Sequence, residues 1–113
     1  MGAPRQKTGT ALVIANISIF PLGKGESLSG FVAQAVEEVD KSGLDYRLTA
    51  MGTLVEGEWG EVMTLVKKMR DRLLKKSNRL YLNITIDERG DKRRRLESKI
   101  KSVERILHKS LKK

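Results

Sequence analysis

The apolar residues of this chain recur with two different periods, and the order of those periods constrains the fold more than any other feature of the sequence. Four short stretches alternate between apolar and polar residues or are rich in β-branched residues, which predicts β-strands at 12–20, 46–50, 53–56 and 79–87. Three longer stretches repeat apolar residues every three or four positions, which predicts α-helices at 28–42, 61–76 and 92–111. The order β-α-β-β-α-β plus a C-terminal helix predicts an α+β fold, the ferredoxin-like sandwich, formed as a single domain over residues 1–113.

Small polar residues and glycines mark the boundaries of these elements. Ser27 is a suitable N-cap for the first helix, and Gly43 can take the left-handed conformation that often follows a helix C-terminus. Gly52 turns the chain between the second and third strands, so these strands are expected to form a hairpin. Residues 1–11 show neither period, and we expect them to form a flexible N-terminus.

The sandwich leaves one face of its sheet uncovered by helices, and the strand periods predict which residues lie there. In the first strand every second residue would pack beneath the helices: Val13, Ala15, Ile17 and Ile19. The other residues of the first strand would line the open face, together with the polar residues of the last strand. These are Leu12, Ile14, Asn16, Ser18, Phe20, Tyr81, Asn83, Thr85 and Asp87. This mixed apolar and hydrogen-bonding surface suits a partner subunit, a ligand, or both.

The C-terminal helix carries a narrow apolar stripe that is typical of a two-helix seam rather than a broad core face. Its members follow steps of three and four: Leu96, Ile100, Val103, Leu107 and Leu111. The stripe and the open sheet face are two separate surfaces that one subunit cannot cover well. Two different symmetric contacts would form a closed assembly, so we expect a homotetramer built as a dimer of dimers.

The positive charge of the chain lies at its ends. The net charge is +9, and residues 88–113 hold eleven Lys or Arg against four Asp or Glu. Solvated terminal segments are the favoured interpretation, with a nucleic-acid or anion patch as the alternative. An RNA-recognition domain has the same element order but stacks bases on aromatic residues of its central strands. Because the predicted third strand, 53–56, contains no aromatic residue, nucleic-acid binding is the less favoured function.

The sequence offers no basis for catalysis, a metal site or a bound cofactor. It contains no Cys, and its one histidine, His108, lies near the end of the last predicted helix. No nucleophile motif of the G-x-S-x-G kind is present. No apolar run reaches the roughly 20 residues of a membrane-spanning helix, and the first residues do not resemble a secretory signal. We therefore expect a non-enzymatic cytoplasmic protein without membrane association.

Five segments resemble a known family when they are taken in order along the chain. They are SIFPLG at 18–23, GLDYRLTAMGT at 43–53, EG at 56–57, TIDERGD at 85–91 and SKIKSV at 98–103. Together they resemble the small thiamine-binding protein family related to YkoF. The resemblance implies a ferredoxin-like subunit that assembles into dimers and tetramers. It also implies binding of thiamine or its hydroxymethylpyrimidine half, without catalysis.

Two positions depart from the pattern of that family. Ala50 stands where the family usually has proline, and Gly90 stands where a second arginine usually follows Arg89. The first departure would loosen the hairpin beside the ligand pocket, and the second would weaken a subunit or anion contact. Neither removes a group that we assign to the pyrimidine.

An aminopyrimidine presents ring-nitrogen acceptors and an amino donor, so its pocket needs short polar side chains and a carboxylate or amide. We expect the site between the open sheet face and the hairpin, where Gly52 lets the backbone approach a ligand. The candidate ligand-binding residues are Asn16, Ser18, Phe20, Met51, Gly52, Thr53, Glu56 and Thr85. Two alternatives remain open: a polar contact between subunits through Asn16, Ser18 and Thr85, and a salt bridge between Glu56 and Arg47.

Three classes of function therefore remain. The favoured one is a carrier or sensor of a small ligand. The others are a structural or regulatory oligomer without ligand, and a nucleic-acid binder. An enclosed pocket with convergent polar groups would favour the first class, and a continuous basic surface would favour the third.

Overall fold

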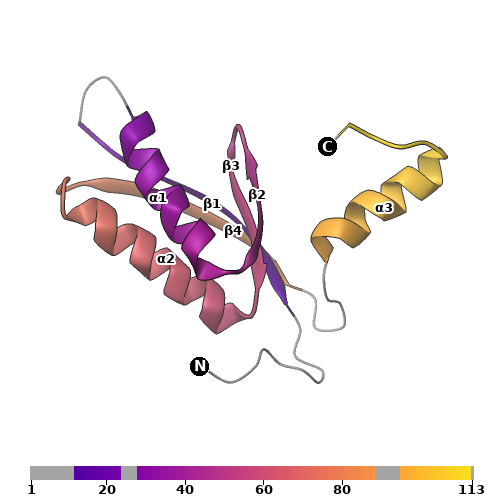
Figure 1. The fold of residues 1–113 in the computed structure, drawn as a ribbon, viewed down its shortest axis with the longest axis horizontal. Helices are drawn as coiled ribbons and strands as arrows, with labels where there is room; N and C mark the ends of the chain where they lie inside the picture. The colour runs from indigo at the N-terminus through magenta and orange to yellow at the C-terminus, as the bar shows by residue number, and fades with distance from the viewer. Residues whose placement is uncertain (1–11, 24–27, 89–94, 113) are drawn as a thin grey trace.

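The computed structural model describes residues 12–23, 28–88 and 95–112 (Figure 1). The elements are β1 (Val13–Pro21), α1 (Ser29–Ser42), β2 (Asp45–Thr49), β3 (Gly52–Gly57), α2 (Trp59–Leu74), β4 (Leu80–Glu88) and α3 (Arg95–Leu107). The strands form one sheet in the order β2-β3-β1-β4, and each neighbouring pair is antiparallel. This is the ferredoxin-like α+β sandwich that the order of periods predicted.

The core lies between the sheet and the two helices α1 and α2, which lie on the same side of the sheet in Figure 1. The four β1 residues predicted to face the helices are buried, between 0% and 6% exposed: Val13, Ala15, Ile17 and Ile19. In β4, Tyr81, Asn83 and Thr85 are exposed, whereas Ile84 and Ile86 pack against the core. The alternation in the sequence thus identified the two faces of the sheet over β1 and β4. Leu12, predicted on the open face, is instead buried at 5% exposure, because it precedes the first residue of β1 and does not follow the alternation of the strand.

Helix α1 follows the prediction at its end and departs from it at its start. Gly43 follows the helix with φ +77°, the left-handed conformation predicted there. The N-cap position is held by Leu28 without a side-chain hydrogen bond, and Ser27, the predicted N-cap, lies outside the described residues. Leu28 and Val32, which the helical spacing of apolar residues would place on the buried face, are 37% and 40% exposed. Val32 borders a cavity, and the buried residues of the helix are Ala35 and Val39 in its later turns.

Helix α2 begins with a reciprocal capping box. The backbone N–H of Glu58 donates to Glu61 Oε1 at 2.9 Å, and the Glu58 side chain accepts from the Glu61 backbone. The buried face of the helix is formed by Val62, Leu65, Val66, Met69 and Leu73. Met63 is only partly buried, whereas Leu65 is 2% exposed and takes a core position.

The strands β1 and β3 stop pairing halfway along β1, and their separation creates the cavity described below. Their pairing ends at Ile17 opposite Thr53, whereas β1 remains paired with β4 as far as Pro21 opposite Leu80. In Figure 1 the β2–β3 hairpin turns away from the direction in which β1 and β4 continue. The last four residues of β1 therefore have β4 on one side and a gap on the other.

Helix α3 stands apart from the sandwich in Figure 1 and makes at most weak contacts with the other described elements. It spans Arg95–Leu107 within the predicted 92–111, and residues 92–94 lie outside the described part of the chain. Val103 and Leu107 of the predicted stripe are 45% and 50% exposed, and the Leu96 side chain is not among those described. No helix in the described ranges is long and apolar enough to cross a membrane.

Candidate functional site

A cavity of about 170 Å³ occupies the gap between the second half of β1 and the β2–β3 hairpin. Helix α1 and one residue of α2 close its inner side. The lining residues are Ile17, Ser18, Ile19, Phe20, Val32, Ala35, Val36, Leu48, Thr49, Ala50, Met51, Gly52, Thr53 and Met69. Five of the eight residues predicted to bind ligand are in this set: Ser18, Phe20, Met51, Gly52 and Thr53. The structure therefore brings together segments that are more than thirty residues apart in the sequence.

Hydrogen bonds hold the hairpin wall of the cavity in place. The Ser18 hydroxyl donates to the Met51 carbonyl oxygen at 3.2 Å, which ties β1 to the hairpin turn. Within the turn, Thr49 Oγ1 donates to the Gly52 carbonyl at 2.8 Å and accepts from the Met51 backbone N–H at 3.1 Å. The Thr49 side chain thus closes the turn around Ala50.

Asn16 lies beside the cavity, although it is not one of the lining residues. It pairs with Leu54 on one side and Thr85 on the other. Its Oδ1 atom is buried and has no hydrogen-bond partner in the described part of the protein. A Cβ atom built on Gly52 would lie 2.5 Å from that oxygen, so the carboxamide packs directly over the glycine.

The mouth of the cavity is apolar. Met51 is 82% exposed, Leu48 61% and Val32 40%. Phe20 is half-buried and stacks on Tyr81, with ring centroids 5.3 Å apart. Exposed apolar side chains around a concave site favour a ligand or another protein surface over water. Val32, Leu48 and Thr49 also line the cavity but were not predicted, because a helix or strand period shows which element a residue belongs to and not which cavity it borders.

The structure does not bring Thr85 and Glu56 to the cavity. Thr85 is exposed on the open face beside Asn16, one strand away from the gap. Glu56 is four residues beyond Gly52, roughly 13 Å along the strand, and its side chain is buried at 2% exposure. Arg47 lies opposite Leu54 and pairs with Asp45 at 3.0 Å.

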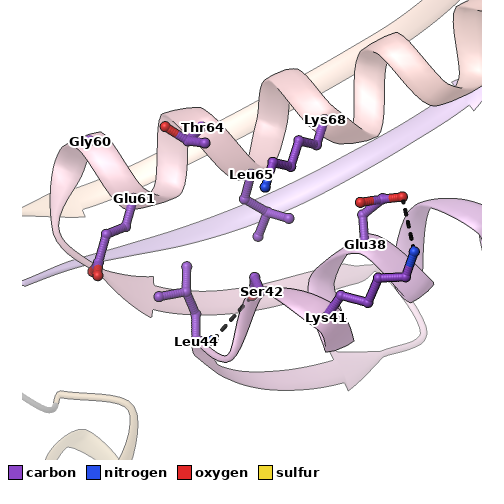
Figure 2. Close-up of a pocket in the computed structure, with 9 residues that line it drawn as sticks. All are labelled: Glu38, Lys41, Ser42, Leu44, Gly60, Glu61, Thr64, Leu65 and Lys68. Atoms are coloured by element: carbon purple, nitrogen blue, oxygen red, sulfur yellow. Dashed lines mark hydrogen bonds and ion pairs between the residues drawn. The ribbon is translucent and has the colours of Figure 1, made fainter. Parts of the chain in front are cut away.

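A larger cavity, of about 410 Å³, lies between the C-terminal end of α1 and the start of α2 (Figure 2). Two of its acidic side chains, Glu38 and Glu61, are engaged with their neighbours. Figure 2 shows Glu38 and Lys41 directed toward each other at 3.9 Å, and Glu61 belongs to the capping box of α2. The adjoining groove, of about 670 Å³, runs along the ion pairs of Arg72. Because the acidic side chains here already pair with Lys41 and Arg72, the smaller cavity at the hairpin is the better candidate for a ligand site.

Known proteins that resemble this chain are found both by sequence and by structure. Residues 15–104 match the model of a family described as thiamine-binding protein. A UPF0045 protein of Methanocaldococcus jannaschii is 38% identical over 91 residues, which cover 80% of this chain and 91% of that protein. The UPF0045 protein YqgV of Bacillus subtilis is 34% identical over 102 residues, covering 85% and 98%.

Two solved structures share the fold over most of their length. The crystal structure of a hypothetical protein from M. jannaschii superposes with a TM-score of 0.76 at 38% identity, over 81% of this chain and 95% of that chain. A Thermotoga maritima structure, described as a candidate thiamine biosynthesis/salvage protein, gives a TM-score of 0.72 at 27% identity. The superposition covers 81% of this chain and 98% of the T. maritima chain.

Proposed function

Since this chain belongs to the thiamine-binding protein family, we propose that it binds thiamine or its hydroxymethylpyrimidine half without catalysing a reaction. The observation that carries the proposal is the cavity at the hairpin, where Ser18, Gly52 and Thr53 meet. It lies next to the buried Asn16 Oδ1 atom, which has no hydrogen-bond partner among the described residues. A buried polar atom without a partner is unfavourable in the empty protein, and a bound heteroaromatic ring offers compensating hydrogen bonds.

The size of the cavity favours the pyrimidine half of thiamine as the part held within one subunit. Its volume of about 170 Å³ is smaller than the roughly 300–1,000 Å³ of sites that enclose a drug-sized ligand. A single substituted ring needs less space than the two linked rings of thiamine. The thiazolium half would then extend past the apolar mouth formed by Val32, Leu48 and Met51.

The proposal includes assembly into a homotetramer in the cytoplasm. Two exposed apolar surfaces support the assembly: the mouth of the cavity with the open sheet face, and the stripe of α3 that includes Val103 and Leu107. A neighbouring subunit at the first surface would also enlarge and close the ligand site. The same exposed surfaces favour the alternative function, a structural or regulatory oligomer that fills the mouth with side chains and binds no ligand.

Calorimetric titration of the purified protein with thiamine and with hydroxymethylpyrimidine tests the proposal. Saturable binding of either compound at one site per subunit supports it. Absence of heat from both, repeated by following the protein's melting temperature with each compound at millimolar concentration, would contradict it and leave the structural oligomer as the better interpretation.

A further inference from the structure

We propose that the groove between α1 and α2 is a second binding site, which takes the phosphate chain of a small oligophosphate such as a nucleoside triphosphate. The groove has a volume of about 670 Å³ and adjoins the cavity drawn in Figure 2. This volume is within the range of sites that bind small molecules. The inference is independent of the proposed function, because the groove and the hairpin cavity have no lining residue in common.

The two helices form the groove with one face each. The lining positions follow helical spacing: 34, 37, 38 and 41 in α1, and 68, 71, 72 and 75 in α2, with 76 in the turn that follows. Figure 2 shows Lys41 and Lys68 extending from the two helices toward the space between them. The charged side chains of both helices therefore meet in the groove.

The acidic side chains of the groove are already paired with cations. Arg72 contacts the carboxylates of Glu37 at 2.6 Å and Glu38 at 2.9 Å. Asp71 forms an ion pair with Lys67 at 2.7 Å. Each of the three carboxylates is thus held by an arginine or by a lysine outside the groove, and none forms an ion pair with the remaining lysines of α2.

Three lysines on the same face of α2 have no such partner. The exposed ammonium groups of Lys68, Lys75 and Lys76 form no ion pair or hydrogen bond within the described part of the chain. The partial negative charge at the C-terminal end of α2 favours lysines at 75 and 76, but it does not account for Lys68, two turns earlier. The lining as a whole has five Lys or Arg against three Asp or Glu, so the groove attracts an anion.

The spacing of these lysines indicates which kind of anion fits. Lys68 and Lys75 are seven residues apart, which places them on the same side of α2 and about 10.5 Å apart along its axis. Positive charge distributed over this length suits an extended anion better than a compact one. Lysine binds phosphate groups as a point charge, without the fixed geometry of arginine. Because none of the lining residues is aromatic, a nucleobase has no ring to stack on, and we expect the phosphate chain alone to be recognised.

Calorimetric titration with inorganic tripolyphosphate, at low salt and without divalent cations, tests the site. We expect saturable binding at one site per subunit, at least ten-fold tighter than orthophosphate, with equal affinities for ATP and GTP. Lys68→Gln and Lys75→Gln should each weaken tripolyphosphate binding roughly two- to five-fold, the range for an exposed ion pair. Lys109→Gln removes the same charge at an exposed position outside the groove and should keep the parent affinity.

Two further measurements separate the site from folding and from the proposed function. Both groove variants should melt at the parent temperature, because the substituted side chains are exposed, and should bind hydroxymethylpyrimidine as the parent does. If Lys109→Gln weakens tripolyphosphate binding as much as Lys68→Gln, only the net charge of +9 attracts the anion and the inference is wrong.

The occupant is tested by the same titrations. Absence of saturable tripolyphosphate binding overturns the inference, whatever the result for hydroxymethylpyrimidine. ATP and GTP that differ more than ten-fold in affinity would show that the base is recognised and contradict a site for the phosphate chain alone. A single-stranded oligonucleotide that binds more tightly than tripolyphosphate, and depends equally on Lys68 and Lys75, would replace the small molecule by nucleic acid.

Discussion

The hydroxyl groups of Ser18 and Thr53 provide two of the hydrogen-bonding side chains that line the cavity at the hairpin. Thr53 is 5% exposed, so a ligand group that it contacts is largely removed from water. Loss of one hydrogen bond to a buried neutral group costs about 1 kcal/mol, which corresponds to roughly five-fold in affinity. Ser18→Ala and Thr53→Val should each weaken binding of thiamine or hydroxymethylpyrimidine by about that factor in calorimetric titration.

The oligomeric state provides the control for these two variants, since neither hydroxyl lies on the α3 stripe. Sedimentation of both variants should match the parent, as should the affinity of Thr64→Val, at an exposed α2 position outside this cavity. Unchanged affinity in both Ser18→Ala and Thr53→Val would show that the ligand lies elsewhere.

Gly43 carries a different kind of constraint, because its backbone is left-handed and its surroundings are empty. Its φ is +77°, and a built Cβ meets nothing within 4 Å. Gly43→Ala should therefore lower the free energy of unfolding by about 1 kcal/mol through backbone strain alone. Gly30 lies inside α1 with equally open surroundings, so Gly30→Ala should leave the protein as stable as the parent or more stable. Urea unfolding of the two variants measures whether each substitution raises or lowers the free energy of unfolding.

Among the elements, α1 and α2 are joined by the guanidinium of Arg72. It contacts Glu37 Oε1 at 2.6 Å and Glu38 Oε2 at 2.9 Å. The hydrogen bond from Arg72 and its positive charge hold the pKa of the Glu37 carboxyl below its ordinary value of 4.5. A carboxyl whose pKa is lower in the folded state stabilises the fold above its unfolded pKa, and this contribution is lost as the pH falls through the folded pKa.

Glu37→Gln should accordingly reduce stability at pH 7, and the difference from the parent should shrink as the pH is lowered below about 4.5. The effect should be small and should decrease with added salt, because the Glu37 side chain is 55% exposed. Urea unfolding at pH 7 and pH 3 provides the measurement. Lys41→Met is the matched comparison, since Lys41 is 62% exposed and lies 3.9 Å from Glu38, and it should have less effect. A Glu37→Gln difference that is the same at both pH values would contradict the role given to Arg72.

For the whole molecule, the free-standing α3 is the feature that a single subunit leaves unexplained. Val103, Ile106 and Leu107 are between 45% and 75% exposed, and α3 makes at most weak contacts with the other described elements. Apolar side chains on an isolated helix are stabilised when they are buried against another helix. We expect this stripe to form one of the two contacts of the tetramer.

Replacing both Ile100 and Leu107 by Asp should lower the assembly by at least one level in sedimentation, from tetramer to dimer. Lys101→Asp, at an exposed α3 position outside the stripe, adds a negative charge without touching the apolar contact and is the control. A parent protein that sediments as a monomer at micromolar concentration would contradict the predicted assembly.

The periods of the apolar residues were sufficient to predict the elements, their order and the two faces of the sheet, with Leu12 as the exception. Strand and helix periods are local properties, so Val13, Ala15, Ile17 and Ile19 could be assigned to the core before any pairing was known. Turn chemistry is local as well, which is why the end of α1 at Gly43 was predicted correctly. The positions Ser18, Phe20, Met51, Gly52 and Thr53 were selected partly by family resemblance, and the structure gathers them around one cavity.

The shape of the candidate site depended on long-range pairing, which no local pattern contains. The register of β1 against β3 decides that their pairing stops at Ile17 and Thr53 and leaves the gap. It also sets the Asn16 carboxamide over Gly52, thirty-six positions further along the chain, and keeps Glu56 away from the cavity. A one-residue change of register would turn each of these side chains to the other face of the sheet. The residues of the site can thus be proposed from local sequence. Their arrangement around one cavity follows only from the packing of the folded chain.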